Sequence, residues 1–179
     1  MAQINFDIIN HDLTLLSRFA DQWRVTFNPS KTFYLIFSLK KVIQQLNPIY
    51  FNNTIIKESQ ELVSLGLSIN NKLNWNDHVY KLIKKASKRL YILRKHKDVF
   101  PRKALVQIYL AMIRPILEFG DVIYDSCSLA TGQAIESIQR QAALICTGGY
   151  RHTGYSSLLT ELDWQSLTDK CRMHKLTHY

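Results

Sequence analysis

The chain has 179 residues, enough for one ordinary domain or two small domains that share an interface. A hydrophobic content of 46% and a charged content of 21% are typical of globular proteins and argue against bulk disorder, and no apolar run approaches the ~20 residues of a membrane span. The net charge of +9 and a pI of about 9.5 indicate a polyanionic partner, and no membrane partner is expected.

An α+β region is predicted for residues 1–70. Apolar residues at spacings of three and four predict a helix over residues 9–23, followed by a short strand over 25–28. The β-branched and aromatic run over 32–37 predicts a second strand. A tight hairpin is expected at Asn52-Asn53, because asparagine tolerates positive φ. Residues 62–69 predict a further strand, in which Gly66 indicates a bulge or a close backbone approach.

An all-α region is predicted for residues 71–179. Asn74 or Asn76 is expected to cap its first helix. Pro101 suits the start of a second helix, and Pro115 should end or kink it because proline has no amide hydrogen. A helix over 134–145 should stop at Gly148-Gly149, and short helices are expected over 156–163 and 165–177. The predicted buried positions of the first two helices are Val79, Leu82, Ile83, Ala86, Leu90, Leu93, Leu105, Ile108, Tyr109, Met112 and Ile113.

The first helix of this region carries a run of positive charge. Residues 1–70 have six basic and five acidic side chains, so +8 of the net charge falls after residue 70. Between residues 81 and 97 there is no acid, and a basic face opposite the apolar one can follow a phosphate backbone. A merely solvated face usually mixes both signs. The predicted nucleic-acid-binding residues are Lys81, Lys84, Lys85, Lys88, Arg89, Arg94, Lys95 and Lys97.

Metal-binding and disulfide patterns are weak. Cys127, Cys146 and Cys171 are odd in number and widely spaced, which argues against a disulfide framework and favours a reducing, intracellular compartment. Residues 1–9 contain Asp7 and no basic segment, unlike a signal peptide. Cys171-x-x-His174 supplies at most half of a zinc site, so no metal is expected.

The sequence contains few residues that match known catalytic motifs. There is no Gly-x-Ser-x-Gly and no phosphate-binding glycine loop. Phe19-Ala20-Asp21 is similar to part of the Phe-Ala-Asp-Asp box of polymerases, but Gln22 replaces the second aspartate. The tripeptide also falls within a predicted helix, where an aspartate pair would not be presented in a turn.

Several segments, in order, resemble reverse transcriptases of non-long-terminal-repeat (LINE or jockey-like) retrotransposons. Residues 23–32 (Trp-Arg-Val-Thr-Phe-Asn-Pro-Ser-Lys-Thr) are similar to the stretch that follows the catalytic box in that family. The further matching segments are Leu65-Gly66, residues 73–78 (Leu-Asn-Trp-Asn-Asp-His), 85–90 (Lys-Ala-Ser-Lys-Arg-Leu), Ile108-Tyr109, 112–120 (Met-Ile-Arg-Pro-Ile-Leu-Glu-Phe-Gly) and 138–143 (Ile-Gln-Arg-Gln-Ala-Ala).

The resemblance implies part of a right-hand polymerase. Residues 1–70 would be distal palm, and 71–179 the thumb with a helical extension. Lys31 would lie near the incoming nucleotide and act as a general acid toward pyrophosphate, and the alternative is a surface lysine at the entrance of a strand. Leu65 and Gly66 would form the primer grip, and the basic helix would lie along an RNA–DNA hybrid or template–primer duplex.

The resemblance also predicts that catalysis is incomplete. In this family, Mg²⁺ is held by carboxylates of two palm motifs that are expected before Met1, together with the fingers. No cofactor is therefore expected in this chain, and Mg²⁺ only in the full-length enzyme. Our hypothesis is a fragment of an RNA-directed DNA polymerase. The alternatives are a stand-alone basic nucleic-acid-binding module and a decayed reading frame without a selected role.

Overall fold

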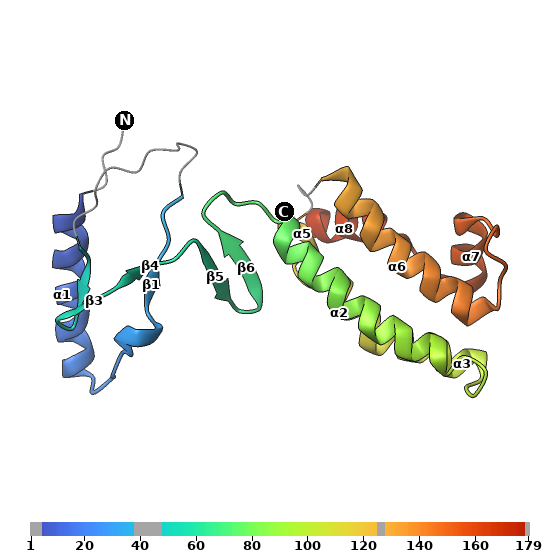
Figure 1. The fold of residues 1–179 in the computed structure, drawn as a ribbon, viewed down its shortest axis with the longest axis horizontal. Helices are drawn as coiled ribbons and strands as arrows, with labels where there is room; N and C mark the ends of the chain where they lie inside the picture. The colour runs from blue at the N-terminus through green and yellow to red at the C-terminus, as the bar shows by residue number, and fades with distance from the viewer. Residues whose placement is uncertain (1–4, 38–47, 125–127, 178–179) are drawn as a thin grey trace. The chain divides into compact units, whose positions relative to one another are not determined.

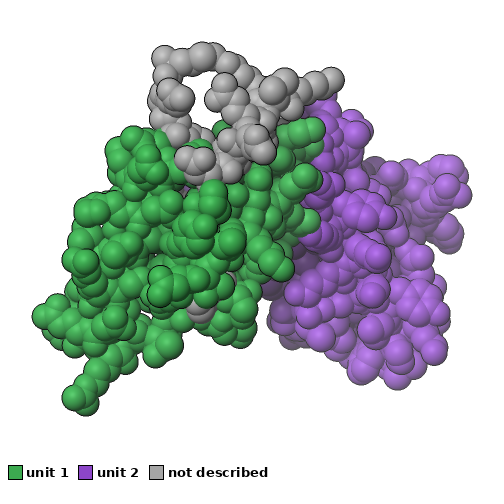
Figure 2. All heavy atoms as spheres, turned by 60° about the vertical axis from the view of Figure 1, so that its left-hand side comes forward, with its two compact units in different colours: residues 1–74 green, residues 75–179 purple. Residues whose placement is uncertain are grey.

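The computed structural model describes residues 5–37, 48–124 and 128–177, and Cys127 lies outside them. The chain divides into two compact units, residues 1–74 and 75–179, coloured green and purple in Figure 2. Unit 1 mixes a helix with short strands and unit 2 is helical, so the fold is α+β, as expected (Figure 1). The division follows Asn74 rather than residue 70. Among the described residues, no helix is both long and apolar enough to cross a membrane.

Unit 1 begins with helix α1 (Phe6–Gln22), which starts earlier than the predicted residue 9. The cause is Asn5, whose side-chain oxygen accepts hydrogen bonds from the amides of Asp7 and Ile8 at 3.1 and 3.4 Å. Such a cap satisfies amides that have no partner within the helix. A small core joins α1 to the strand region through Phe6, Ile49, Phe51 and Ile56.

The predicted strand over residues 25–28 is wrong. The amide of Val25 donates to the carbonyl of Ala20 at 2.9 Å, and Arg24 has a φ of +54°, so this segment closes the end of α1. A short 3₁₀ turn, η1 (Pro29–Lys31), follows it. The strand predicted over 32–37 shortens to β1 (Phe33–Tyr34), which pairs in parallel with β4 (Lys57–Glu58).

Two hairpins complete unit 1. The predicted hairpin at Asn52-Asn53 is confirmed: β2 (Tyr50–Phe51) pairs with β3 (Thr54–Ile55), and both asparagines have positive φ, +48° and +59°. The single strand predicted over 62–69 is wrong, because β5 (Glu61–Ser64) and β6 (Leu67–Asn70) form an antiparallel hairpin. Leu65 and Gly66 are its two turn residues, with φ of +49° and +86°, so Gly66 supplies a turn rather than a bulge.

Unit 2 is a helical bundle. After α2 the chain reverses direction, and α3, η2 and α4 run back alongside α2. Helix α6 then runs parallel to α2 (Figure 1). Its elements are α2 (Asn76–Lys95), α3 (Arg102–Ile108), the π-helical turn η2 (Tyr109–Ile113), α4 (Arg114–Glu118), α5 (Asp121–Tyr124), α6 (Leu129–Thr147), α7 (Tyr155–Leu162) and α8 (Leu167–Thr177).

The bundle core confirms most of the predicted apolar positions. Of those on α2, Ile83 alone is only half-buried, and on the next helix Leu105, Tyr109 and Ile113 are buried. Met112 is exposed, contrary to prediction, because it lies within the π turn, where the α-helical spacing is broken. Pro115 does not end the helical run: it lies in the first turn of α4, directly after the π turn, where the missing amide hydrogen of proline is tolerated.

The helix ends of unit 2 follow the sequence in one case and depart from it in another. Gly148 caps α6 with a left-handed φ of +70°, as predicted. The predicted asparagine cap of α2 is wrong, because Trp75 precedes the helix without a side-chain cap. The side-chain oxygen of Asn76 instead accepts hydrogen bonds from Thr131 Oγ1 at 3.2 Å and the Ser128 amide at 3.4 Å. Asn76 therefore tethers α2 to the start of α6.

Candidate nucleic-acid interface

Helix α2 has one buried and one basic face. Its apolar residues pack into the bundle core, together with His78, which contacts the rings of Trp75 and Tyr124. Burial and the nearby Lys81 lower the pKa of His78, which favours a neutral ring inside the bundle. Seven of the eight predicted basic side chains are exposed on this helix or in the turn after it: Lys81, Lys84, Lys85, Lys88, Arg94, Lys95 and Lys97.

Two of the predicted nucleic-acid-binding residues are used within the bundle. Arg89 is half-buried, and its guanidinium donates to the backbone carbonyl of Met112. Arg94 donates to the side-chain oxygen of Gln141 at 2.7 Å. Arg89 lies three residues after the buried Ala86 and four before the buried Leu93, so its place beside the core is readable from helical spacing. The exposed basic surface therefore consists of six lysines and Arg94, whereas Arg89 is partly withdrawn from it.

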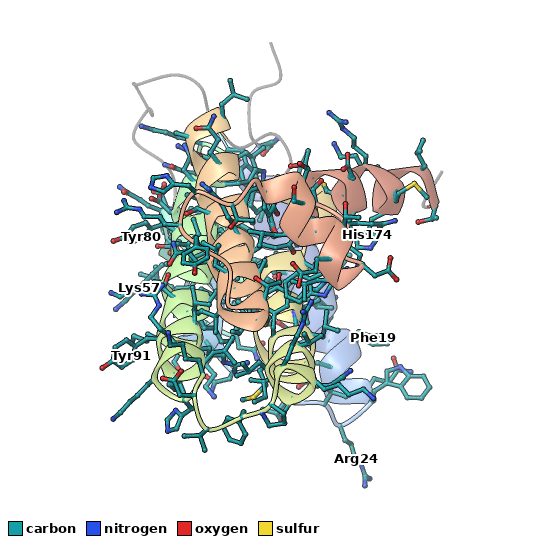
Figure 3. The ribbon with its side chains drawn as sticks, turned by 90° about the vertical axis from the view of Figure 1, so that its right-hand side faces the viewer. Phe19, Arg24, Lys57, Tyr80, Tyr91 and His174 are labelled. Atoms are coloured by element: carbon teal, nitrogen blue, oxygen red, sulfur yellow. The ribbon has the colours of Figure 1, made fainter. Side chains whose placement is uncertain are left out.

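Two tyrosines lie on the same face of α2 as the lysines, and the prediction from charge did not include them. Tyr80 and Tyr91 are each 65% exposed and project from the same side of α2 (Figure 3). With Lys84, Lys88 and Lys95 they form a stripe at spacings of four, four, three and four, which marks one face of a helix. We call these five residues the tyrosine–lysine stripe. The sequence gives the spacing of these five residues, but only the structure shows that both tyrosine rings are exposed.

A shallow groove follows this stripe. It is lined by apolar, aromatic and basic side chains, namely Tyr80, Ile83, Lys84, Ser87, Lys88, Tyr91 and Ile92. Beyond Tyr80 and Ile83 a second depression continues to the start of α6, beside Ala130 and Ala134. The nearest acids along the chain are Asp77 in the first turn of α2 and Asp98 after it. The groove thus offers apolar contacts beside uncompensated positive charge.

Lys31 is exposed at the end of η1 in unit 1. Asn28 orders the turn before it: its side-chain oxygen accepts from the amide and the hydroxyl of Ser30, at 3.0 and 2.7 Å. The Asn28 carbonyl also accepts from the Lys31 amide at 3.1 Å. The backbone at Lys31 is therefore held by local hydrogen bonds, and its ammonium group faces solvent.

The predicted primer-grip residues form the tip of the β5–β6 hairpin. Leu65 is 93% exposed and has positive φ, a combination unfavourable for a leucine in both respects. The hairpin follows β4 after two residues. Lys31, Leu65 and Gly66 belong to unit 1, whereas the tyrosine–lysine stripe belongs to unit 2.

The acidic, histidine and cysteine side chains do not suggest a metal centre. Cys171 and His174 both contact Asp121, through its backbone carbonyl at 3.4 Å and its carboxylate at 2.7 Å, and so join α8 to α5. In the described part of the chain, no three His, Cys, Asp or Glu side chains form a group that could hold a metal. Asp7 and Asp21 lie at opposite ends of α1, about 20 Å apart at 1.5 Å per residue, and do not fit a shared Mg²⁺.

A cavity of about 540 Å³ lies among α4, α5, α6, α7 and α8. The carboxylates on its wall already have partners: Glu118 with Arg114 and Lys170, and Glu136 with Thr168 and Tyr155. Burial and the hydrogen bond to Glu136 raise the pKa of Tyr155, which keeps its hydroxyl protonated as a donor. These polar groups hold the helices together.

Comparison with known proteins relates the chain to RNA-directed DNA polymerases, that is, reverse transcriptases. It is 21% identical over 165 residues to a protein described as probable RNA-directed DNA polymerase from transposon BS, of Drosophila melanogaster. The alignment covers 90% of this chain but 18% of that protein, so the chain spans less than a fifth of its relative. No family model matches the chain, and no solved structure does.

Proposed function

We propose that the chain is part of the reverse transcriptase of a non-long-terminal-repeat retrotransposon and that it holds the nucleic-acid substrate. The observation that carries this proposal is the similarity to a transposon RNA-directed DNA polymerase over 90% of the chain. The mixed α+β unit 1 corresponds to distal palm in this proposal, and the helical unit 2 corresponds to the thumb. The remaining palm and the fingers of a full-length polymerase would be partners of unit 1.

In this proposal α2 lies along the template–primer duplex or RNA–DNA hybrid. Its exposed lysines would neutralise phosphates and release condensed counterions, a source of affinity that does not depend on base sequence. Arg89 and Arg94 would contribute indirectly, because they fix α2 against the rest of the bundle.

Leu65, Gly66 and Lys31 would serve the primer and the incoming nucleotide. Leucine at an exposed position with positive φ is costly, and such strain often marks functional sites. A contact of this hairpin tip with a primer backbone would account for it. Lys31, on a turn ordered by Asn28, would be a proton donor to pyrophosphate.

Nucleotidyl transfer by this chain alone is not part of the proposal. Asp21 lies in the last turn of α1 and is followed by Gln22, so the Phe19-Ala20-Asp21 sequence presents no aspartate pair in a turn. We infer that Mg²⁺ would be bound by carboxylates of the full-length enzyme. The expected result of primer extension on a primed RNA template, with Mg²⁺ and nucleotides, is no product above background. Extended primer would refute this part.

A second candidate function is an autonomous nucleic-acid-binding module formed by unit 2. It is favoured by the size of the unit 2 core, which contains 19 buried residues and draws on α2, α3, α6, α7 and others. Expression of residues 75–179 alone separates the two candidates. Full affinity for nucleic acid in this segment favours the module, whereas a loss on removal of unit 1 favours a joint palm and thumb surface.

Charge reversal tests the basic surface common to both candidates. We expect Lys84→Glu/Lys85→Glu/Lys88→Glu to weaken binding of an RNA–DNA hybrid at least tenfold and to flatten its salt dependence by roughly 0.9 for each phosphate that is no longer neutralised. The matched control is Lys57→Glu/Lys72→Glu/Lys103→Glu, which makes the same charge change at exposed positions outside α2. Equal losses of affinity in both triple variants would contradict the assignment, because total charge alone would then govern binding.

A further inference from the structure

The tyrosine–lysine stripe has a composition that phosphate binding alone does not require. Tyr80 and Tyr91 each leave two-thirds of their surface in contact with solvent, and Ile92 beside them is also exposed. Lysines suffice for a phosphate backbone. Exposed aromatic rings interleaved with lysines are instead typical of surfaces on which unpaired bases stack, since every base has a flat face that a ring can cover.

The helix sets the distance between the two rings. Tyr80 and Tyr91 are 11 residues apart along α2, which corresponds to a rise of about 16 Å. Stacked nucleotides advance about 3.4 Å each, so roughly five nucleotides would span the two tyrosines. Lys84 and Lys88 fall between the rings on the same face and border the groove that connects them. Phosphates between the two stacked positions would therefore pass beside two ammonium groups.

We propose that the groove between Tyr80 and Tyr91 binds a short stretch of single-stranded nucleic acid, with bases stacked on both rings and phosphates on Lys84 and Lys88. This inference rests on the proposed function, since it adds an unpaired strand to the duplex that the α2 face is proposed to contact. The occupant follows from chemical complementarity: the groove combines flat apolar rings with uncompensated positive charge. Bases in a duplex are paired and stacked on each other, so their faces are not accessible to the tyrosines.

The test compares the full chain with two double variants that differ in the ring. Tyr80→Leu/Tyr91→Leu removes both rings and keeps apolar bulk, while Tyr80→Phe/Tyr91→Phe keeps the rings and removes the hydroxyls. Tyr150→Leu is the matched control, because Tyr150 is an exposed tyrosine outside α2. Fluorescence anisotropy would measure binding of labelled oligothymidylate, oligouridylate and a blunt RNA–DNA duplex, and circular dichroism would verify that each variant is folded.

We expect the leucine variant to bind both single strands about tenfold more weakly or worse, and the duplex with nearly unchanged affinity. The phenylalanine variant and Tyr150→Leu should bind single strands as the unmodified chain does. A loss for oligouridylate but not oligothymidylate would restrict the ligand to RNA, and the reverse to DNA, and both support the site.

Three outcomes would overturn the inference. The first is that the leucine variant binds single strands as the unmodified chain does. The second is that this variant loses equal affinity for single strand and duplex. The third is that it self-associates less than the unmodified chain in sedimentation velocity, which would identify the groove as a protein contact. If the lysine reversal weakens hybrid binding while the leucine variant binds normally, this inference fails and the proposed function stands. If the unmodified chain binds none of the three nucleic acids, both fail.

Discussion

The side chain of Gln139, fully buried in α6, links this helix to η2, to α7 and to the segment before α8. Its oxygen accepts a hydrogen bond from the Tyr109 hydroxyl at 2.7 Å, and its amide nitrogen donates to the Tyr155 hydroxyl and the Gln165 carbonyl at 3.0 and 2.8 Å. Tyr109 also stacks on Trp164, with ring centroids 4.3 Å apart. A buried network of this kind stabilises the fold only while every member keeps its partners.

Gln139→Leu should destabilise unit 2 by about 3 kcal/mol, because it leaves the buried Tyr109 hydroxyl without a partner and removes the hydrogen bond to the Gln165 carbonyl. Urea unfolding followed by circular dichroism would measure the change. Tyr109→Phe/Gln139→Leu should recover part of the loss, since the orphaned hydroxyl is removed as well. Strictly additive effects of the two substitutions would show that the two side chains are not coupled.

Glu118 should make the stability of unit 2 depend on acid pH. Burial alone would raise its pKa, but hydrogen bonds from Lys170 at 2.8 Å and Arg114 at 2.6 Å outweigh burial and hold the pKa below its ordinary value of 4.5. A lowered native pKa contributes stability above that ordinary value, and this contribution is lost as the pH falls through the native pKa.

Replacing Glu118 by Gln should therefore lower the melting temperature at neutral pH and reduce its further decline below about pH 4.5. Thermal melts across this pH range would measure both effects. Glu161→Gln is the control. Glu161 pairs with Arg102 at 2.6 Å, but both side chains are about half exposed. Because solvent screens such a pair, it should contribute little to stability. Identical pH profiles for the two variants would contradict the assignment.

Among the helix ends and turns, local residue types predicted one hairpin turn and one helix end correctly. Asparagine at both turn positions of β2–β3 and glycine after α6 adopt positive φ because few other residues do so without strain. The turn at Leu65-Gly66 was not recognised because leucine is a poor residue for that position. Because Leu65 is itself apolar, the sequence pattern over residues 62–69 predicts one continuous strand instead of two strands joined by a turn.

Two glycines of α6 provide a paired prediction. Gly148→Ala should destabilise unit 2 by about 1 kcal/mol, because alanine is strained at a φ of +70° although nothing crowds its Cβ. Gly132→Ala should stabilise it by roughly 0.5–1 kcal/mol, since Gly132 lies within the helix and its Cβ would also meet open space. Chemical unfolding of both variants would test the signs. Equal signs would show that helix propensity and capping do not govern these positions.

For the whole molecule, the main asymmetry is between the cores of the two units. The unit 1 core consists of Phe6, Ile49, Phe51 and Ile56 with partly buried neighbours, whereas α1 exposes Leu15, Leu16 and Phe19, and Trp23 directly after the helix is exposed as well. An exposed apolar surface of this kind normally meets a partner. In the proposed function that partner is the remainder of the palm.

Limited proteolysis should therefore attack unit 1 first. Fewer buried apolar contacts imply a smaller free energy of local opening, and opening exposes the backbone to the protease. Mass spectrometry of early digests should find a resistant product that begins near Trp75. Thermal melts should show one sharp transition from unit 2. Simultaneous cleavage of both units, or a broad melt of the whole chain, would contradict this and favour a decayed chain without a stable fold.

The sequence alone determined those features that depend on the local spacing of residues. The helices of unit 2, the buried stripe of α2 and its lysine run, and the turn at Asn52-Asn53 all follow from spacings within a few residues. The tertiary structure decided what depends on distant partners. It turned Arg89 and Arg94 toward the backbone of η2 and the side chain of Gln141, and used Asn76 to tether α6 rather than cap α2. It also left Tyr80 and Tyr91 exposed, because no other described element of unit 2 covers that side of the helix.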